Sequence, residues 1–198
     1  MDPLEGEPMQ RVGKFEKLSL KQFISDFFSR FPASRVDSDI SMPEMFDMIN
    51  KFYDDVVLPE RATGGSAGYD IHTPIGIQLD PGEDTWIPLG IKCKIEPGWF
   101  LMIVPRSGSG SKYRLRLANT AGIIDSDYYN NENNEGHIQI RICNEGDDVF
   151  DVDAGTAIAQ AIFVPYGITE DDKAEGERNG GFGSTDVTTD TANINNDQ

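Results

Sequence analysis

Cysteine and histidine are scarce in this 198-residue chain, which contains two of each. Cys93 and Cys143 each lie in a short run that alternates apolar and polar residues, so we interpret them as reduced thiols packed in a sheet. The two histidines, His72 and His137, belong to no Ser-His-Asp or Cys-His pattern of the kind that nucleophilic catalysis uses. A Walker-type phosphate-binding sequence is missing as well.

Basic residues are also few. The chain has 17 Lys and Arg against 34 Asp and Glu, which gives a formal net charge of −17. A protein that grips the phosphates of a nucleic acid needs Lys and Arg to neutralise them, so this balance argues against direct nucleic-acid binding. It still allows one phosphorylated small molecule, which needs only a local cluster of donors.

No apolar run approaches the roughly 18 residues of a membrane span. The acidic start, MDPLEGEP, lacks the apolar segment of a signal peptide. We therefore expect a soluble, cytoplasmic protein with no membrane contact.

Residues 1–56 form an N-terminal extension with a polar start and two segments of helical periodicity. The first predicted helix covers 19–31, with Ser19 as its cap and Pro32 as its end. The second covers 43–54, although a strand in its MINKF stretch is an alternative. We expect these aromatic stripes to serve mainly as packing surface.

Residues 57–166 show a different pattern. Short runs of alternating apolar residues are separated by turn signals about every 8–12 residues, which predicts an all-β sandwich or barrel. No helical periodicity is seen in this segment. Residues 167–198 are polar and carry a single aromatic residue, Phe182, so we expect a flexible C-terminal arm.

Five short segments stand out as candidates for chemistry. Arg106 lies among small residues that let backbone N–H groups approach an anion. Asp125 and Asp127 are spaced to share one face of a strand. Gln160 is the one interior amide of an apolar strand, and Phe182 is set among glycines. The five segments are GSAGYD at 65–70, PRSGSG at 105–110, NTAGIIDSDYY at 119–129, GTAIAQAIFVPY at 155–166 and RNGGFGST at 178–185.

Each segment taken alone is better explained as a turn, a loop, a hairpin cap, a residue that satisfies a buried backbone group, or a linker. Their combination is more specific. Two Gly-rich loops with Arg suit oxyanions, carboxylates suit a metal or a water, and a lone aromatic residue can stack on a base.

In order and spacing, the five segments resemble the motifs of the trimeric dUTPase family over roughly residues 60–185. The resemblance implies an all-β, jelly-roll-like barrel that forms a homotrimer, with active sites that each draw on three subunits. It also implies Mg²⁺-dependent hydrolysis of dUTP to dUMP and pyrophosphate. The N-terminal KFEKLSLKQF, the DYYNNENNEGHI hairpin and RNGGFGST are similar to a variant found among Firmicutes and their phages.

The resemblance further implies roles for matching residues. Asp125 holds the water that attacks the α-phosphorus, while Arg106 and Gln160 act at the phosphates. Asp70 contacts waters of Mg²⁺, which the substrate's phosphates mainly hold, and Tyr128 packs under the sugar where a 2′-OH would clash. The other implied substrate-binding residues are Asn119, Ile123, Ile124 and Gln139 at uracil, Ser107 and Gly108 at phosphate, Phe182 stacked on uracil, and Arg178, Gly183 and Ser184 at the outer phosphates.

Four features depart from the family pattern. Ala157 stands where an Arg is common, Arg178 is one residue nearer the arm's aromatic residue, and Asp186 replaces a glycine. Residues 129–135 enlarge the hairpin beside the uracil pocket.

Two other functions stay open. One is a dCTP deaminase of the same fold. The other is a dUTPase-like regulatory or interaction module that binds a protein partner through residues 1–56. For that segment, packing against the β core is the favoured role.

Overall fold

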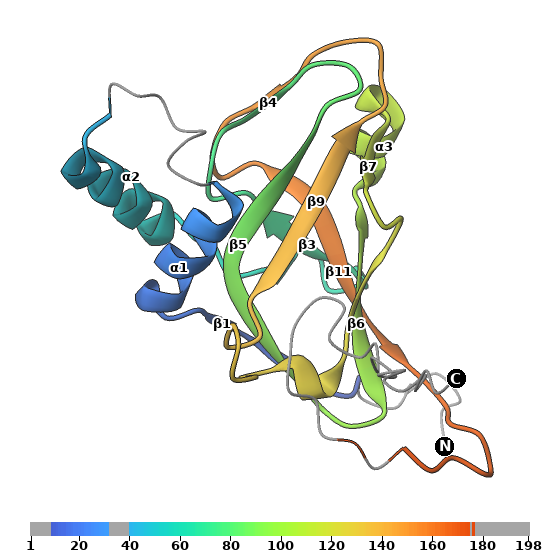
Figure 1. Cartoon of the computed structure of the whole chain (residues 1–198). Helices are drawn as coiled ribbons and strands as arrows, with labels where there is room; N and C mark the ends of the chain where they lie inside the picture. Colours follow the sequence, from blue (N-terminus) through green and yellow to red (C-terminus); the bar gives the residue numbers. More distant parts are fainter. Residues whose placement is uncertain (1–8, 32–39, 175, 177–198) are drawn as a thin grey trace, which may run out of the picture.

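Two antiparallel sheets pack face to face and enclose the main core (Figure 1). The structure is a computed structural model and describes residues 9–31, 40–174 and 176. The four-stranded sheet contains, in order, β1 (Gly13–Lys17), β5 (Asp84–Ile95), β9 (Ile138–Asn144) and β7 (Leu115–Leu117). The five-stranded sheet contains β2 (Glu60–Arg61), β3 (Tyr69–His72), β11 (Ala157–Pro165), β6 (Trp99–Pro105) and β8 (Gly122–Ile124). A two-stranded ribbon contains β10 (Phe150–Val152) and β4 (Ile77–Leu79).

The core follows from alternation along the strands. In β9, Ile138, Ile140 and Ile142 are buried, whereas Arg141 between them is exposed. Successive side chains of a strand point to opposite faces, so this spacing turns the isoleucines inward. The predicted all-β, jelly-roll-like fold is confirmed.

Both predicted helices are present, as α1 (Leu20–Arg30) and α2 (Met42–Asp54). The Ser19 hydroxyl accepts a hydrogen bond from the Gln22 N–H and caps α1. Ser41 and Glu44 form a capping box at the start of α2, which excludes the alternative strand. Residues 32–39, including the expected helix end at Pro32, lie outside the described residues.

α1 packs against β5, and the two helices form a small second core with each other (Figure 1). Phe23 and Ile49 are fully buried in this second core. Phe23 packs so close to Gly90 of β5 that a β-carbon there would lie 3.2 Å from its ring and 2.6 Å from Val56. Gly90 also has φ +70°, so glycine suits this position for two reasons.

Three elements were not predicted. β1 lies inside the N-terminal extension yet pairs with β5 along its whole length, from Gly13↔Ile95 to Lys17↔Ile91. A short helix, α3 (Ser107–Tyr113), and a 3₁₀ turn, η2 (Ser126–Tyr128), interrupt the β-rich region. Such short or charged segments carry too little apolar periodicity to signal their structure.

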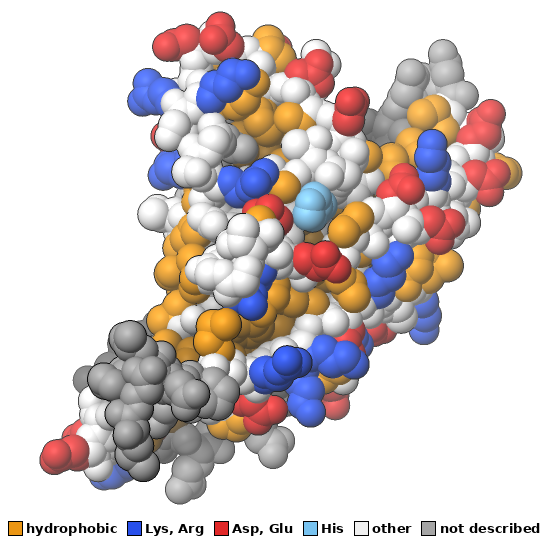
Figure 2. Space-filling model, turned by 180° about the vertical axis from the view of Figure 1, so that it is seen from behind, with side chains coloured by type: hydrophobic (Ala, Val, Ile, Leu, Met, Phe, Trp, Pro, Cys, Tyr) orange, Lys and Arg blue, Asp and Glu red, His pale blue; other side chains and the backbone are white. Residues whose placement is uncertain are grey.

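Acidic, basic and apolar side chains are interspersed on the face shown in Figure 2, where apolar side chains line a hollow. Within the described ranges, no helix has the length and apolar character needed to cross a membrane.

Candidate functional site

Three of the five segments come together around Arg106 on the five-stranded sheet. Asp70 of β3 is the register partner of Gln160 of β11, which is in turn the partner of Val104 of β6. Partners on neighbouring strands project to the same face, so the carboxylate and the amide lie side by side. Arg106 follows β6 directly. The predicted grouping of Asp70, Arg106 and Gln160 is therefore present within one chain.

Arg106 is oriented by two contacts. Its Nε lies 3.1 Å from Asp70 Oδ1 and its terminal nitrogen donates to Asp70 Oδ2 at 3.3 Å, which makes a two-pronged ion pair. A second terminal nitrogen donates to the Ala157 carbonyl at 3.2 Å. The Arg106 side chain is 40% exposed, so this oriented guanidinium remains open to a ligand.

Small residues continue the site beyond Arg106. Ser107 and Gly108 are exposed in the first turn of α3, and the Gly110 N–H donates to the Arg106 carbonyl. N–H groups in the first turn of a helix have no acceptor within the helix and can donate to an anion. The arrangement suits a phosphate that contacts Arg106 and the backbone together.

His72 joins this face and was not singled out from the sequence. It follows Asp70 by two residues on β3, so the two side chains share a side of the strand. Its Nδ1 is buried and has no hydrogen-bond partner within the described part of the chain. The spacing of two residues in YDIH was the signal available for finding it.

Asp125 lies at a different place. It follows β8 and lines a cavity of about 300 Å³ together with Phe100, Ile123, Ser126, Asp127 and Tyr166. Ile124 pairs with Leu101 near the start of β6, whereas Arg106 follows the end of that strand. About five residues of extended strand, roughly 17 Å, separate the two positions. A single chain thus does not bring Asp125 to Arg106.

The residues expected at uracil differ in their exposure to solvent. Asn119 is exposed after β7, and Ile123 is 53% exposed on β8, which forms the edge of its sheet. Ile124 is buried. The Gln139 side chain is also buried and accepts a hydrogen bond from Arg30 Nε at 2.7 Å, so only its backbone suits base recognition.

Tyr128, for which the resemblance implies a contact with the sugar, is largely buried. It is 5% exposed, and its hydroxyl donates to the His137 carbonyl at 3.0 Å. The same hydroxyl accepts from Asn134 Nδ2 at 2.8 Å. Little of its side chain is therefore accessible to a ligand in one chain.

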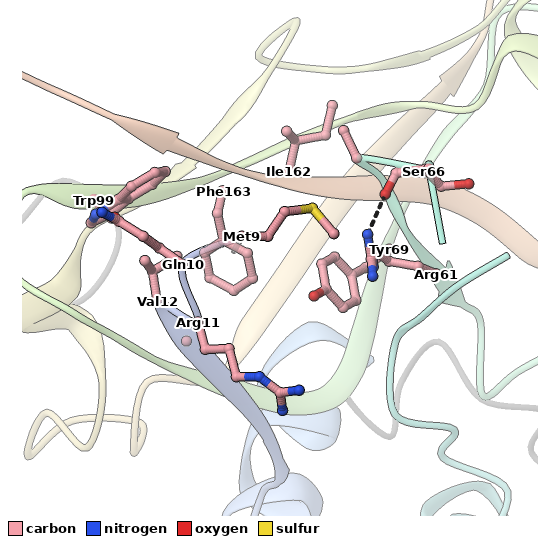
Figure 3. A pocket seen from close by; sticks show the side chains of 13 residues that line it. Met9, Gln10, Arg11, Val12, Arg61, Ser66, Tyr69, Trp99, Ile162 and Phe163 are labelled. Atoms are coloured by element: carbon pink, nitrogen blue, oxygen red, sulfur yellow. Dashed lines mark hydrogen bonds between the residues drawn. The ribbon is translucent and has the colours of Figure 1, made fainter. Parts of the chain in front are cut away.

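A larger cavity of about 850 Å³ lies where the chain enters β1 (Figure 3). Tyr69, Trp99 and Phe163 line it together with Arg11, and Arg61 donates to the Ser66 carbonyl at 3.0 Å on its rim. It borders the first motif segment but is not lined by Asp70, Arg106 or Gln160. No residue pattern in the sequence indicated this cavity.

One carboxylate has chemistry suited to Mg²⁺, and it belongs to the residue for which the family resemblance implies that role. The described residues contain no group of three or more His, Cys, Asp or Glu side chains arranged to hold a metal alone. Mg²⁺ commonly binds through one or two carboxylates, retained waters and substrate phosphates. The Asp70 carboxylate, 25% exposed beside Arg106, suits that kind of site.

The remaining expected residues, Arg178, Phe182, Gly183 and Ser184, lie outside the described residues, as does the departure at Asp186.

Comparison with known proteins gives consistent matches. The sequence model of the dUTPase family matches residues 54–186. The deoxyuridine 5′-triphosphate nucleotidohydrolase of Lactococcus lactis is 37% identical over 143 residues, which cover 71% of this chain and 95% of that protein. The dUTPase of Streptococcus mutans has a similar structure, with a TM-score of 0.54 and 35% identity over 59% of this chain and 91% of its own. A Staphylococcus bacteriophage 80alpha dUTPase with dUPNHPP has a TM-score of 0.52 and 26% identity, covering 67% and 94%.

Proposed function

Because the chain belongs to the dUTPase family, we propose that it hydrolyses dUTP to dUMP and pyrophosphate by attack of water on the α-phosphorus, with Mg²⁺. Such an activity keeps uracil out of DNA and supplies dUMP for dTMP synthesis, and we place it in the cytoplasm. The observation that carries the proposal is the meeting of Asp70, Arg106 and Gln160 on one sheet face.

The phosphates bind at this face. Arg106 contacts a phosphate oxygen, with support from Ser107 and Gly108, and Gln160 acts through a water. Mg²⁺ offsets much of the charge of the triphosphate when bound, and Asp70 would hold its waters. Phosphoryl transfer depends mainly on such positioning and charge stabilisation.

Asp125 acts as the general base for the attacking water. Its distance from Arg106 within one chain supports a homotrimer in which different subunits contribute the base and the phosphate loop. A positioned base contributes about 10²–10⁴-fold to the rate, so the charged groups at the phosphates supply much of the rest.

Base and sugar are recognised by residues that lie on and around β8 and at the start of β9. The Asn119 side chain and the backbone of Ile123, Ile124 and the Ile138–Gln139 stretch read the uracil edge. A donor aimed at O4 rejects cytosine, whose amino group would leave that donor unpaired. Tyr128 excludes a 2′-OH.

The C-terminal arm completes the site. Phe182 stacks on uracil, while Arg178, Gly183 and Ser184 contact the outer phosphates. Tyr166, where the arm begins, lines the same cavity as Asp125, which supports the arm's closing at this place.

A nucleotide panel tests the proposal. Purified protein with Mg²⁺ should release pyrophosphate from dUTP much faster than from UTP or dTTP. Absence of pyrophosphate from dUTP would contradict it. Release of ammonia from dCTP would instead identify the deaminase.

A partner-binding role of residues 1–56 is the second candidate. Met42 and Phe46 of α2 are 51% and 38% exposed and could contact another protein. Packing is favoured because Phe23 and Ile49 are fully buried. Deleting the whole segment would also remove β1, so Phe46→Ser is the cleaner variant. Unchanged melting temperature and turnover would leave this face available for a partner.

A further inference from the structure

A buried polar chain connects α1 with the tyrosine assigned to the sugar. Asp26 Oδ2 of α1 lies 2.6 Å from His137 Nδ1, and the His137 side chain is fully buried. His137 Nε2 lies 2.9 Å from the Gly90 nitrogen and accepts its N–H. A ring nitrogen that accepts leaves the proton on the other nitrogen, so Nδ1 donates to Asp26. The imidazole is thus fixed at both ends.

From His137 the chain of contacts reaches Tyr128. The His137 carbonyl accepts from the Tyr128 hydroxyl, which in turn accepts from Asn134 Nδ2. The hydroxyl therefore both donates and accepts within the fold, and its position depends on two residues of the following loop. Asn131 forms a third hydrogen bond to Tyr128, since its Nδ2 donates to the Tyr128 carbonyl at 2.8 Å.

The same loop is also fastened to the start of α1. Glu135 accepts hydrogen bonds from the Ser19 hydroxyl at 2.5 Å and from the Ser19 N–H at 3.2 Å. Lys92 of β5 lies 3.6 Å from Glu135. The enlarged hairpin, one of the departures from the family pattern, and the start of α1 therefore support one another.

We propose that Asp26, through His137, is a positioning residue for Tyr128, and that α1 thereby contributes to the rejection of ribonucleotides. The proposal rests on the proposed function, in which Tyr128 packs under the deoxyribose. Steric rejection of a 2′-OH depends on where the ring stands, and a displacement of about 1 Å can change a rate about 10²-fold.

The simpler role for Asp26 is to fasten α1 to the sheet. A purely fastening role predicts that removing Asp26 lowers the stability and the active fraction, with equal effect on both substrates. A positioning role predicts a change in the ratio of kcat/KM for dUTP to kcat/KM for UTP. The amount of active enzyme cancels in that ratio.

The test compares this ratio in Asp26→Ala, Asp26→Asn and the parent protein. Asp26→Ala removes the acceptor of His137 Nδ1, and we expect the ratio to fall about tenfold. Asp26→Asn keeps an oxygen that can accept from Nδ1, so its ratio should stay near that of the parent. Tyr53→Phe is the matched control, because Tyr53 donates to the Leu18 carbonyl at 2.7 Å and fastens α2 to the segment that precedes α1.

A second variant covers the case in which Asp26→Ala does not fold. Asn134→Asp replaces the amide donor to the Tyr128 hydroxyl with an acceptor of the same shape, and its ratio should fall as well. An unchanged ratio in Asn134→Asp and in any folded Asp26→Ala would overturn the proposal. Failure of the parent protein to hydrolyse dUTP would overturn the proposed function itself, which is a separate outcome.

Discussion

The Gln160 side chain lies over Gly68, so close that a β-carbon on Gly68 would stand 2.5 Å from Gln160 Oε1. From there, Gln160 Nε2 reaches towards the Pro105 carbonyl at 3.5 Å. The glycine before Tyr69 thus provides the space that sets the amide beside Asp70 and Arg106. The need for glycine at position 68 of the GSAGYD segment thus follows from its contact with Gln160 of the GTAIAQAIFVPY segment.

Gly68→Ala should displace the Gln160 amide, because the end of a flexible side chain moves more easily than a strand. We expect kcat/KM for dUTP to fall about tenfold, as expected for displacement of a positioning group. The melting temperature should change little. Steady-state kinetics and thermal unfolding measure the two effects.

Gly65→Ala is the matched control, since a β-carbon there has no neighbour within 4 Å. Equal kinetics for the two variants would show that the position of the Gln160 amide does not matter to the reaction.

The local residue pattern predicted both helices and the β-rich body. Ser19 and Ser41 mark the starts of two amphipathic helices, and alternation marks the β body. β1 was missed because its five residues, GKFEK, are too few and too charged to signal a strand, and its structure comes from pairing with β5. Such pairing is a tertiary effect that a local pattern does not report.

Only part of the site was predictable from the sequence. The family resemblance named Asp70, Arg106 and Gln160, and the strand register brings them together. The pairing of Asp26 with His137 spans 111 residues of sequence, and no local spacing indicates it. The position of Asp125 away from Arg106 likewise depends on how β8 pairs with β6.

Asp125→Asn tests the general base. The amide keeps the size of the side chain and one acceptor oxygen but cannot take up a proton, so turnover should fall about 10²–10⁴-fold while nucleotide binding persists. Pyrophosphate release gives the turnover, and titration with a non-hydrolysable dUTP analogue gives the affinity.

Asp127→Asn serves as its control, because Asp127 is an exposed carboxylate two residues away along the chain. We expect it to retain most of the turnover. Near-parental turnover in Asp125→Asn would exclude this carboxylate as the base.

Stability should fall as the pH drops below neutral, because of His137. Burial lowers the pKa of His137 below its ordinary 6.5, against the opposing effect of Asp26, and Arg30 lowers it further while Glu135 raises it. The unfolded chain then binds a proton more readily than the folded one, so unfolding is favoured as protons are added. The contribution of His137 is complete above pH 6.5 and is lost as the pH falls from there towards the folded-state pKa.

Three glutamates affect stability only at a lower pH. Hydrogen bonds lower the pKa values of Glu16 and Glu44 from 4.5. Burial raises the pKa of Glu135, but hydrogen bonds from Ser19 and the charge of Lys92 lower it on balance below 4.5. The stabilisation from these three carboxylates is therefore lost only below that pH. Melting temperatures measured from about pH 5 to about pH 8 should therefore decline first in the histidine range. His137→Gln, which cannot titrate there, should show a flatter profile. An equally steep decline in that variant would assign the effect to another group.

The C-terminal arm should matter to turnover and not to the fold. The last contacts of the β body are the hydrogen bond from the Tyr166 N–H to the Gly98 carbonyl and the approach of the Tyr166 and Phe100 rings, whose centroids are 6.3 Å apart. Truncation after Tyr166 leaves β11 complete, so the melting temperature should hold while dUTP turnover becomes poor.

Phe182→Ala separates stacking from the rest of the arm. Stacking of an aromatic side chain on a base contributes about 1–3 kcal/mol, which corresponds to a loss in kcat/KM of about fivefold to a hundredfold. A truncated protein with the kcat/KM of the full chain would show that the arm does not close over the substrate.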